Sequence, residues 1–172
     1  MVFFDVKPVT VKTYGGRRWS SQRLVLRKHQ KTRGRFYLFA LYDVKHDRVR
    51  WRYYHGKDSV AVCRFMQYVR RCYPESEVWV VLDQDRAHPC KSRETRRVMR
   101  ELHLHWISLP KGSPDDNPCE TLFSDIQLMV QDNSDDPDER AMRKHISHRF
   151  MRRNRRQDRF IDIPYLSDSH EG

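Results

Sequence analysis

Val78-Trp79-Val80-Val81-Leu82-Asp83 is the stretch from which the fold of this chain can be worked out. Five apolar residues in a row, without polar alternation, are typical of a strand buried on both faces, as in the centre of a parallel sheet. The run ends on an acid. A second run, Val2-Phe3-Phe4-Asp5, has the same form. The two runs predict buried strands that are each followed by a carboxylate.

Strand and helix patterns surround these two runs. Residues 36–42 are strongly strand-like, residues 48–53 alternate strictly, and together they predict a hairpin. We expect further strands at 9–14 and 104–109. Helix starts are indicated by caps or by acids in a first turn; they lie at Asp58-Ser59, Ser92, Asn117-Pro118 and 136–139. A hairpin joined to parallel strands by crossover helices predicts an α/β fold, a mixed sheet with helices on both faces.

Composition bounds the class of protein. A chain of 172 residues is one domain, or one domain with a tail. At 38% hydrophobic and 33% charged residues it has no apolar run long enough to span a bilayer. The stretch Met1-Val2-Phe3-Phe4-Asp5 lacks the basic start of a signal peptide, so we expect a cytoplasmic location and no membrane partner. The cysteines form no CxxC pair, which favours reduced thiols over a zinc site; they are Cys63, Cys72, Cys90 and Cys119.

Positive charge is concentrated in two blocks. The formal net charge is +11. Residues 12–35 hold nine Lys or Arg and no acid, and residues 140–159 hold nine with one acid, Asp158. Such an excess favours a polyanionic partner through phosphate neutralisation and counterion release. Nucleic acid is therefore the expected partner, although a merely soluble basic surface is the simpler alternative.

Three carboxylates are expected at one edge of the sheet. If the two buried strands are parallel neighbours, Asp5 and Asp83 emerge where open α/β sheets place their sites. Glu120 lies on the first turn of a later helix, at the border of its apolar arc. Each acid also has a purely structural reading, because Asp5 ends a strand, Asp83 opens a turn and Glu120 has the capping-box spacing from Asn117.

Other acids compete for these roles. Asp43 is expected at the opposite edge, and Asp85 and Asp116 are expected to be solvated or to support the site from outside. Three clustered carboxylates are typical of a magnesium site, since magnesium prefers hard oxygen ligands. Two such ions can activate the attacking oxygen and stabilise the leaving oxygen in phosphoryl transfer.

At these residues the chain resembles a known family. Val80-Val81-Leu82-Asp83-Gln84-Asp85, with His88 behind it, and Ser113-Pro114-Asp115-Asp116-Asn117-Pro118-Cys119-Glu120 resemble the catalytic core of mariner-superfamily DDE transposases, above all the bacterial insertion-sequence branch. The resemblance covers residues 1–131. It implies a ribonuclease-H-like fold, DNA cleavage and strand transfer at insertion-sequence ends, and two Mg²⁺ or Mn²⁺ ions. Asp5, Asp83 and Glu120 are then both the catalytic residues and the metal ligands.

This sequence differs from the family pattern at several points, and one difference bears on the expected partners. Gln84 stands where the family often has asparagine, and Val6 where glutamate is common. Only four residues precede Asp5, whereas family members carry helix-turn-helix modules upstream. We therefore expect a catalytic half that works as a homodimer on DNA with a separate helix-turn-helix subunit or upstream reading-frame product. The alternatives are an inactive DNA-binding remnant or inhibitory partner of a full-length transposase, and a structure-specific nuclease of the same fold.

The resemblance also predicts how the domain is laid out. Residues 1–131 form the catalytic domain, with 12–35 as an inserted basic, clamp-like loop that contacts DNA or a dimer partner, and residues 132–172 form a basic helix and tail. A nucleoid-associated protein is expected. The predicted DNA contacts are Arg17, Arg18, Trp19, Lys28, Lys31, His88, Lys111, Arg152, Arg153, Arg155 and Arg156. His88 has the further possible roles of orienting Asp83 or of a loop histidine that bonds only to backbone.

Overall fold

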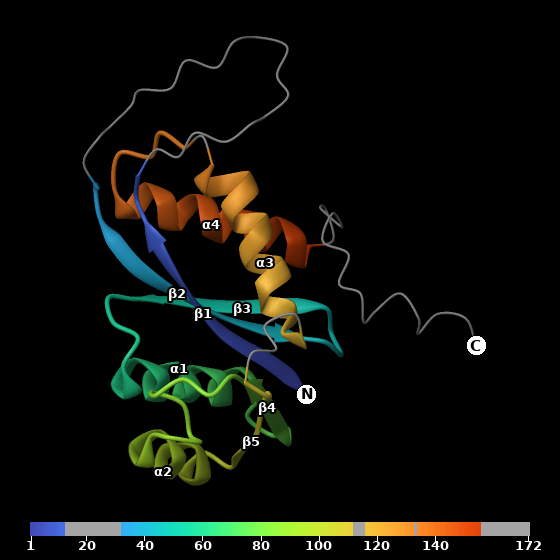
Figure 1. Cartoon of the computed structure of the whole chain (residues 1–172). Coiled ribbons are helices and arrows are strands. Elements are labelled where there is room, and N and C mark those ends of the chain that lie inside the picture. Colours follow the sequence, from blue (N-terminus) through green and yellow to red (C-terminus); the bar gives the residue numbers. More distant parts are fainter. Residues whose placement is uncertain (13–31, 112–115, 133, 156–172) are drawn as a thin grey trace.

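A computed structural model describes residues 1–12, 32–111, 116–132 and 134–155. It is a mixed five-stranded sheet with helices on both faces, as the sequence predicts (Figure 1). Helices α1 and α2 cover one face, and α3 and α4 cover the other. The elements in chain order are β1 (Val2–Thr10), β2 (Arg35–Asp43), β3 (Arg48–Tyr54), α1 (Ser59–Cys72), β4 (Val78–Leu82), α2 (Arg93–Glu101), β5 (Leu104–Ser108), α3 (Pro118–Ile126), a π-helical turn η2 (Gln127–Gln131) and α4 (Glu139–Asn154).

The order of the strands across the sheet is β3-β2-β1-β4-β5. Strands β1, β2 and β3 form an antiparallel meander, and β4 and β5 continue the sheet parallel to β1. The predicted hairpin is β2–β3. Parallel pairing of β1 with β4 is short, since only Val2 and Phe3 have partners, Val80 and Val81.

Strand β1 is longer than the sequence pattern indicates. We expected its first strand to end at Asp5 and a separate strand to begin at Val9. Instead β1 runs from Val2 to Thr10 and pairs with β2 over its whole length, Asp5 opposite Ala40. The expected strand end is wrong because β2 continues to bond β1 after β4 has left it. Residues 13 and 14 of the second predicted strand lie outside the described part of the chain.

Two apolar clusters hold the layers together. On the α1 side, Phe4, Phe39 and Phe65 pack ring against ring, with centroids 5.1 to 5.8 Å apart. On the other side, α3 and α4 bury their apolar side chains on β1, β2 and β3; from α4 these are Met142, Ile146 and Phe150. The predicted basic helix thus shares a core with the sheet. Within the described ranges, no helix is long and apolar enough to cross a membrane.

Helix starts follow the predicted caps. Asp58, Ser92 and Asn117 accept a hydrogen bond from a backbone N–H in the first turn of α1, α2 and α3. Asp138 does the same for α4. Such caps satisfy N–H groups that have no partner inside the helix. They also fix where each helix begins relative to the preceding strand or loop.

One arginine bonds to the turns that connect α1 to β4 and α2 to β5. Half-buried Arg70 donates five hydrogen bonds to backbone carbonyls, all 2.7 to 3.2 Å long. Three acceptors lie between α1 and β4, and two lie in the turn between α2 and β5. The acceptors are Tyr73, Pro74, Ser76, Leu102 and His103. Both strands that follow these turns are therefore held by one guanidinium.

We expect Arg70→Met to lower the free energy of unfolding by about 2 to 4 kcal/mol, because several charge-assisted hydrogen bonds are lost and partly buried carbonyls are left without donors. Arg71→Met is the matched control, since Arg71 is exposed and makes none of these bonds. Urea unfolding followed by circular dichroism measures both variants. Equal stability of the two would contradict the role given to Arg70.

Candidate active site

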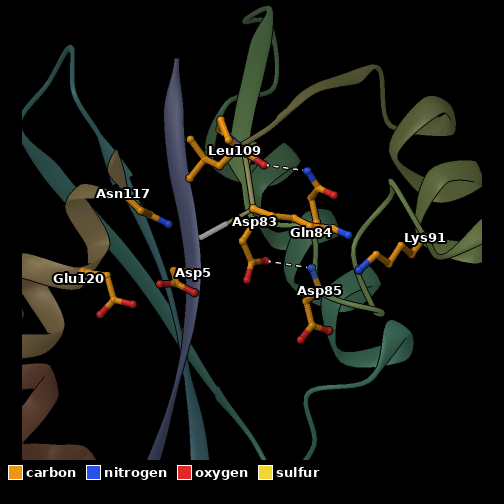
Figure 2. Close-up of a pocket in the computed structure, with 10 residues that line it drawn as sticks. Asp5, Asp83, Gln84, Asp85, Lys91, Leu109, Asn117 and Glu120 are labelled. Carbon is orange, nitrogen blue, oxygen red and sulfur yellow. Dashed lines mark hydrogen bonds between the residues drawn. The ribbon is translucent and has the colours of Figure 1, made fainter. Parts of the chain in front are cut away.

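A pocket of about 400 Å³ opens where β4 has left β1 and α3 begins. Asp5, Asp83 and Glu120 all line it, and in Figure 2 Asp5 lies between the other two. The three predicted acids therefore reach one pocket from β1, from the loop after β4 and from α3. The remaining lining residues are Gln84, Asp85, Lys91, Leu109, Pro110, Lys111 and Asn117.

Asp5 is the least solvated of the three acids. Its side chain lies on the α3 face of β1, and its Oδ1 accepts a 2.7 Å bond from the N–H of Val6. Burial raises the pKa of Asp5 to about 6, and the charges of Glu120 and Asp83 add to the rise against the lowering effect of the Val6 N–H. A carboxylate with this pKa is costly to keep ionised without a cation.

Asp83 is held from behind by His88. The Nδ1 of His88 lies 2.6 Å from Oδ1 of Asp83 and 3.0 Å from the backbone carbonyl of Asp83. The His88 side chain is 4% exposed and packs against the ring of Phe4, whereas the Asp83 side chain is 55% exposed. The hydrogen bond from His88 holds the pKa of Asp83 below its ordinary value. His88 thus orients an ionised carboxylate that faces the pocket.

The neighbouring acids lie where they were expected. Asp85 donates its N–H to Oδ1 of Asp83 at 3.2 Å and pairs with Lys57 at 3.3 Å, so it supports the loop at the rim. Asp43 lies at the other end of the sheet, opposite Val2, and accepts bonds from Tyr73 and His46. Asp116 is exposed and does not line the pocket.

Glu120 owes its position to the anchoring of α3. The side chain of Asn117 caps α3 by accepting the N–H of Cys119 at 3.1 Å, and it donates to the carbonyl of Phe4 at 3.2 Å. The thiol of Cys119 donates to the carbonyl of Phe3 at 3.3 Å. The first turn of α3 is thereby fastened to β1 beside Asp5, and Glu120 faces the pocket.

The donor set fits a hard divalent cation, since three carboxylates surround one water-accessible space. In the arrangement seen, no three His, Cys, Asp or Glu side chains of the described residues converge closely enough to hold one ion. The acids surround the pocket without meeting at one point. An ion would have to draw them together, which the exposed side chains of Asp83 and Glu120 allow.

Two lysines near the acids, Lys91 and Lys7, were not singled out by the sequence patterns. Lys91 lines the pocket just before α2, alongside the predicted Lys111. Lys7 lies on the same face of β1 as Asp5, where burial lowers its pKa and the charges of Glu120 and Asp132 oppose that change. The two-residue spacing from Asp5 was the available signal for Lys7.

The structure sorts the predicted DNA contacts. Lys111 lines the pocket, and Arg152 and Arg155 are exposed at the end of α4. Two predictions are corrected. Arg153 is buried and bonds Asp47, because α4 packs against the β2–β3 turn, and His88 is buried behind Asp83, so neither presents its side chain to a phosphate. The remaining contacts lie outside the described residues; they are Arg17, Arg18, Trp19, Lys28, Lys31 and Arg156.

We expect Asp5→Asn to stabilise the metal-free protein at pH 8 and to have little effect at pH 4. Since the folded-state pKa is raised from 3.8 to about 6, ionising Asp5 costs the folded state more than the unfolded state. The cost is absent below the unfolded pKa and complete above the folded one, about 3 kcal/mol at most. Thermal melts in EDTA across this pH range measure it.

Asp85→Asn is the control of opposite sign. Although burial works against it, the N–H of Ala87 and the ammonium of Lys57 hold the pKa of Asp85 below its ordinary value. Asp85→Asn should therefore destabilise the protein at pH 8. A pH-independent effect of Asp5→Asn would contradict the raised pKa.

Asn117→Ala should cost about 1 to 3 kcal/mol, because it removes both the α3 cap and the bond to Phe4. Asn117→Ser keeps a cap acceptor and loses only the link to β1. The difference between the two variants in urea unfolding isolates the cap. If both variants match the wild type, Asn117 does not anchor α3.

Comparisons with known proteins place this geometry in a family. A family profile described as DDE superfamily endonuclease matches residues 1–143. No curated protein sequence matches the chain. Among solved structures, a pre-cleavage Mos1 transpososome has a TM-score of 0.66 at 14% identity, covering 87% of this chain and 48% of that chain. The Mos1 mariner transposase catalytic domain gives 0.61 at 13%, covering 87% and 69%.

A more distant likeness has the same fold. A chain of the simian T-cell lymphotropic virus intasome, in complex with PP2A regulatory subunit B56 gamma, has a TM-score of 0.54 at 11% identity, covering 84% of this chain and 46% of that chain. The chain spans about half of the first Mos1 chain that it matches, 47%. These likenesses confirm the predicted ribonuclease-H-like fold. Since the family profile covers most of the chain and includes Asp5, Asp83 and Glu120, the chain belongs to the DDE superfamily endonucleases.

Proposed function

We propose that this chain is the catalytic domain of a transposase that cuts DNA at the ends of an insertion sequence and transfers the cut strand to a target. The observation that carries the proposal is the meeting of Asp5, Asp83 and Glu120 at one pocket. Membership of the DDE endonuclease family supports it, as does the likeness in fold to the Mos1 catalytic domain.

Asp5, Asp83 and Glu120 are the proposed ligands of two Mg²⁺ or Mn²⁺ ions. Bound there, the ions would activate a water or 3′ hydroxyl and neutralise charge on the phosphate. Mos1 paired-end complexes have been solved with Mn and with Mg, which supports divalent ions of this kind. The chain itself supplies orientation: His88 fixes Asp83, and Asn117 fixes the helix turn that bears Glu120.

Lys91 and Lys111 line the same pocket as the acids and are the proposed electrostatic guides for the scissile phosphate. A carboxylate cluster alone repels a phosphodiester, so cations beside it lower the cost of approach. The exposed Arg152 and Arg155 at the end of α4 are proposed to contact more distant phosphates.

The partners follow from the relatives. We propose that the chain binds transposon-end and target DNA and works as a dimer on DNA. Mos1 has been solved in paired-end and strand-transfer complexes, which supports a paired arrangement. Terminal-repeat recognition is assigned to a helix-turn-helix module, either a separate subunit or the product of an upstream reading frame. Residues 1–131 are proposed as the catalytic unit, with 12–35 as its clamping loop and 132–172 as a basic extension.

We expect Asp83→Asn to reduce Mn²⁺-dependent nicking of supercoiled DNA at least 100-fold, because one ligand of the proposed ions is lost. DNA binding in electrophoretic shift assays should stay the same or tighten, since one negative charge is removed beside the phosphate. Asp116→Asn is the matched control, because Asp116 is an exposed acid just before α3 that does not line the pocket.

Full nicking activity of Asp83→Asn would refute the proposed active site. If the wild type binds DNA but takes up no Mn²⁺ in isothermal titration, the chain is a non-catalytic DNA-binding protein. Cleavage of branched DNA without joining of pre-cut ends would identify a structure-specific nuclease instead.

A further inference from the structure

A third basic segment, shorter than the two blocks in the sequence, forms a surface of its own. Residues 48–73 hold seven Lys or Arg and one acid, Asp58, which caps the start of α1. The segment contains β3, at the edge of the sheet, and α1, which packs beside it. Four of its arginines are exposed on this pair of elements. Arg48 begins β3, and the other three lie around Tyr54 and Tyr68; they are Arg52, Arg64 and Arg71.

The three arginines are grouped around two tyrosines, Tyr68 on α1 and Tyr54 on β3. Arg64, Tyr68 and Arg71 are spaced four and three residues apart on α1, so they share one face of the helix. The guanidinium of Arg52, from β3, lies 3.7 Å from the ring centroid of Tyr68. Burial raises the pKa of Tyr54, and the charges of all three arginines oppose that rise, so all three act on the same phenol.

In the part of the chain that the structure describes, no carboxylate forms an ion pair with Arg52, Arg64 or Arg71. The neighbouring Arg70, in contrast, donates hydrogen bonds to five backbone carbonyls. Clustered like charges destabilise a fold, so an unneutralised cluster that is held in place points to an anionic partner.

The geometry of Arg52 suits a phosphate. Stacking on Tyr68 fixes the plane of the guanidinium, and one N–H is used on the carbonyl of Trp51 at 3.0 Å. The remaining N–H groups form a planar fork on an exposed side chain, which matches the two oxygens of a phosphodiester. Pre-organisation of this kind reduces the entropy lost on binding.

The cluster is connected to the active site by α1. At the start of that helix Lys57 bonds Asp85, which lines the pocket. The helix has 14 residues and so extends about 21 Å away from the pocket rim. Arg64 and Arg71 lie two turns apart along it.

We propose that Arg52, Arg64 and Arg71 form a phosphate-binding track for duplex DNA, which starts at the Lys57 rim of the pocket and follows α1. The proposal rests on the proposed function for the identity of the polyanion as DNA. It adds a contact surface on the α1 side of the sheet, on the opposite face from α4 and its basic residues (Figure 1).

The test is the binding of a fluorescein-labelled 30-base-pair duplex, measured by anisotropy at several NaCl concentrations. The triple variant Arg52→Gln, Arg64→Gln, Arg71→Gln should bind at least tenfold more weakly than wild type, and its log K against log[salt] slope should be smaller by about 2 to 3. The matched control removes three exposed arginines from α2, by Arg93→Gln, Arg97→Gln and Arg100→Gln. It has the same net charge and should keep the wild-type slope.

Two further measurements keep the outcome clear. Arg64→Gln with Arg71→Gln spares the Arg52 stack and should lower the slope by about 1 to 2 without changing the melting temperature. Mn²⁺ affinity should match the wild type in both track variants. Equal losses in the track and α2 triples, or unchanged slopes, would overturn the track while leaving the proposed function intact. A wild-type chain that does not bind the duplex would instead count against the proposed function.

Discussion

The position of the active site depends on the point at which β1 stops pairing with β4. Strand β1 is paired with β2 from Val2 to Thr10 but with β4 only at Val2 and Phe3. Beyond that point β4 has ended and one side of β1 is open. Asp5 is the first residue on the α3 face after the parting, so its carboxylate meets the loop after β4 and the start of α3. A longer β4 would pair with β1 at Asp5 and close the pocket.

Electrostatics then gives the clustered acids different roles. Burial keeps Asp5 close to neutrality below about pH 6, while the hydrogen bond from His88 keeps Asp83 ionised at the same pocket. Two carboxyl groups with oppositely shifted pKa values can stand together without the full cost of two buried charges. Lys7, two residues after Asp5 on β1, offsets part of the charge of Glu120. A bound divalent cation would compensate the negative charge of the three acids more strongly than Lys7 does and would draw their side chains together.

The sequence predicts what local chemistry determines. Short apolar runs place Asp83, and the string around Asn117 places the cap of α3 and hence Glu120. Long-range strand pairing cannot be predicted in this way. No residue near Asp5 indicates that β1 stays paired with β2 as far as Thr10. Burial of Arg153 is likewise decided by Asp47, which is more than a hundred residues away in the sequence. A run of basic residues does not reveal which of them fold inward.

The arginines show why a count of positive charge overstates the binding surface. Arg70 bonds backbone carbonyls, Arg149 forms a two-bond pair with Asp125, and Arg153 bonds Asp47 while lying over the Tyr42 ring. Each of these guanidiniums stabilises the fold, and none is left for phosphate. Counterion release requires cations that the folded protein has not already neutralised. Among the described residues, the exposed arginines of α1 and β3 are therefore a better basis for the proposed DNA surface than a count of basic residues.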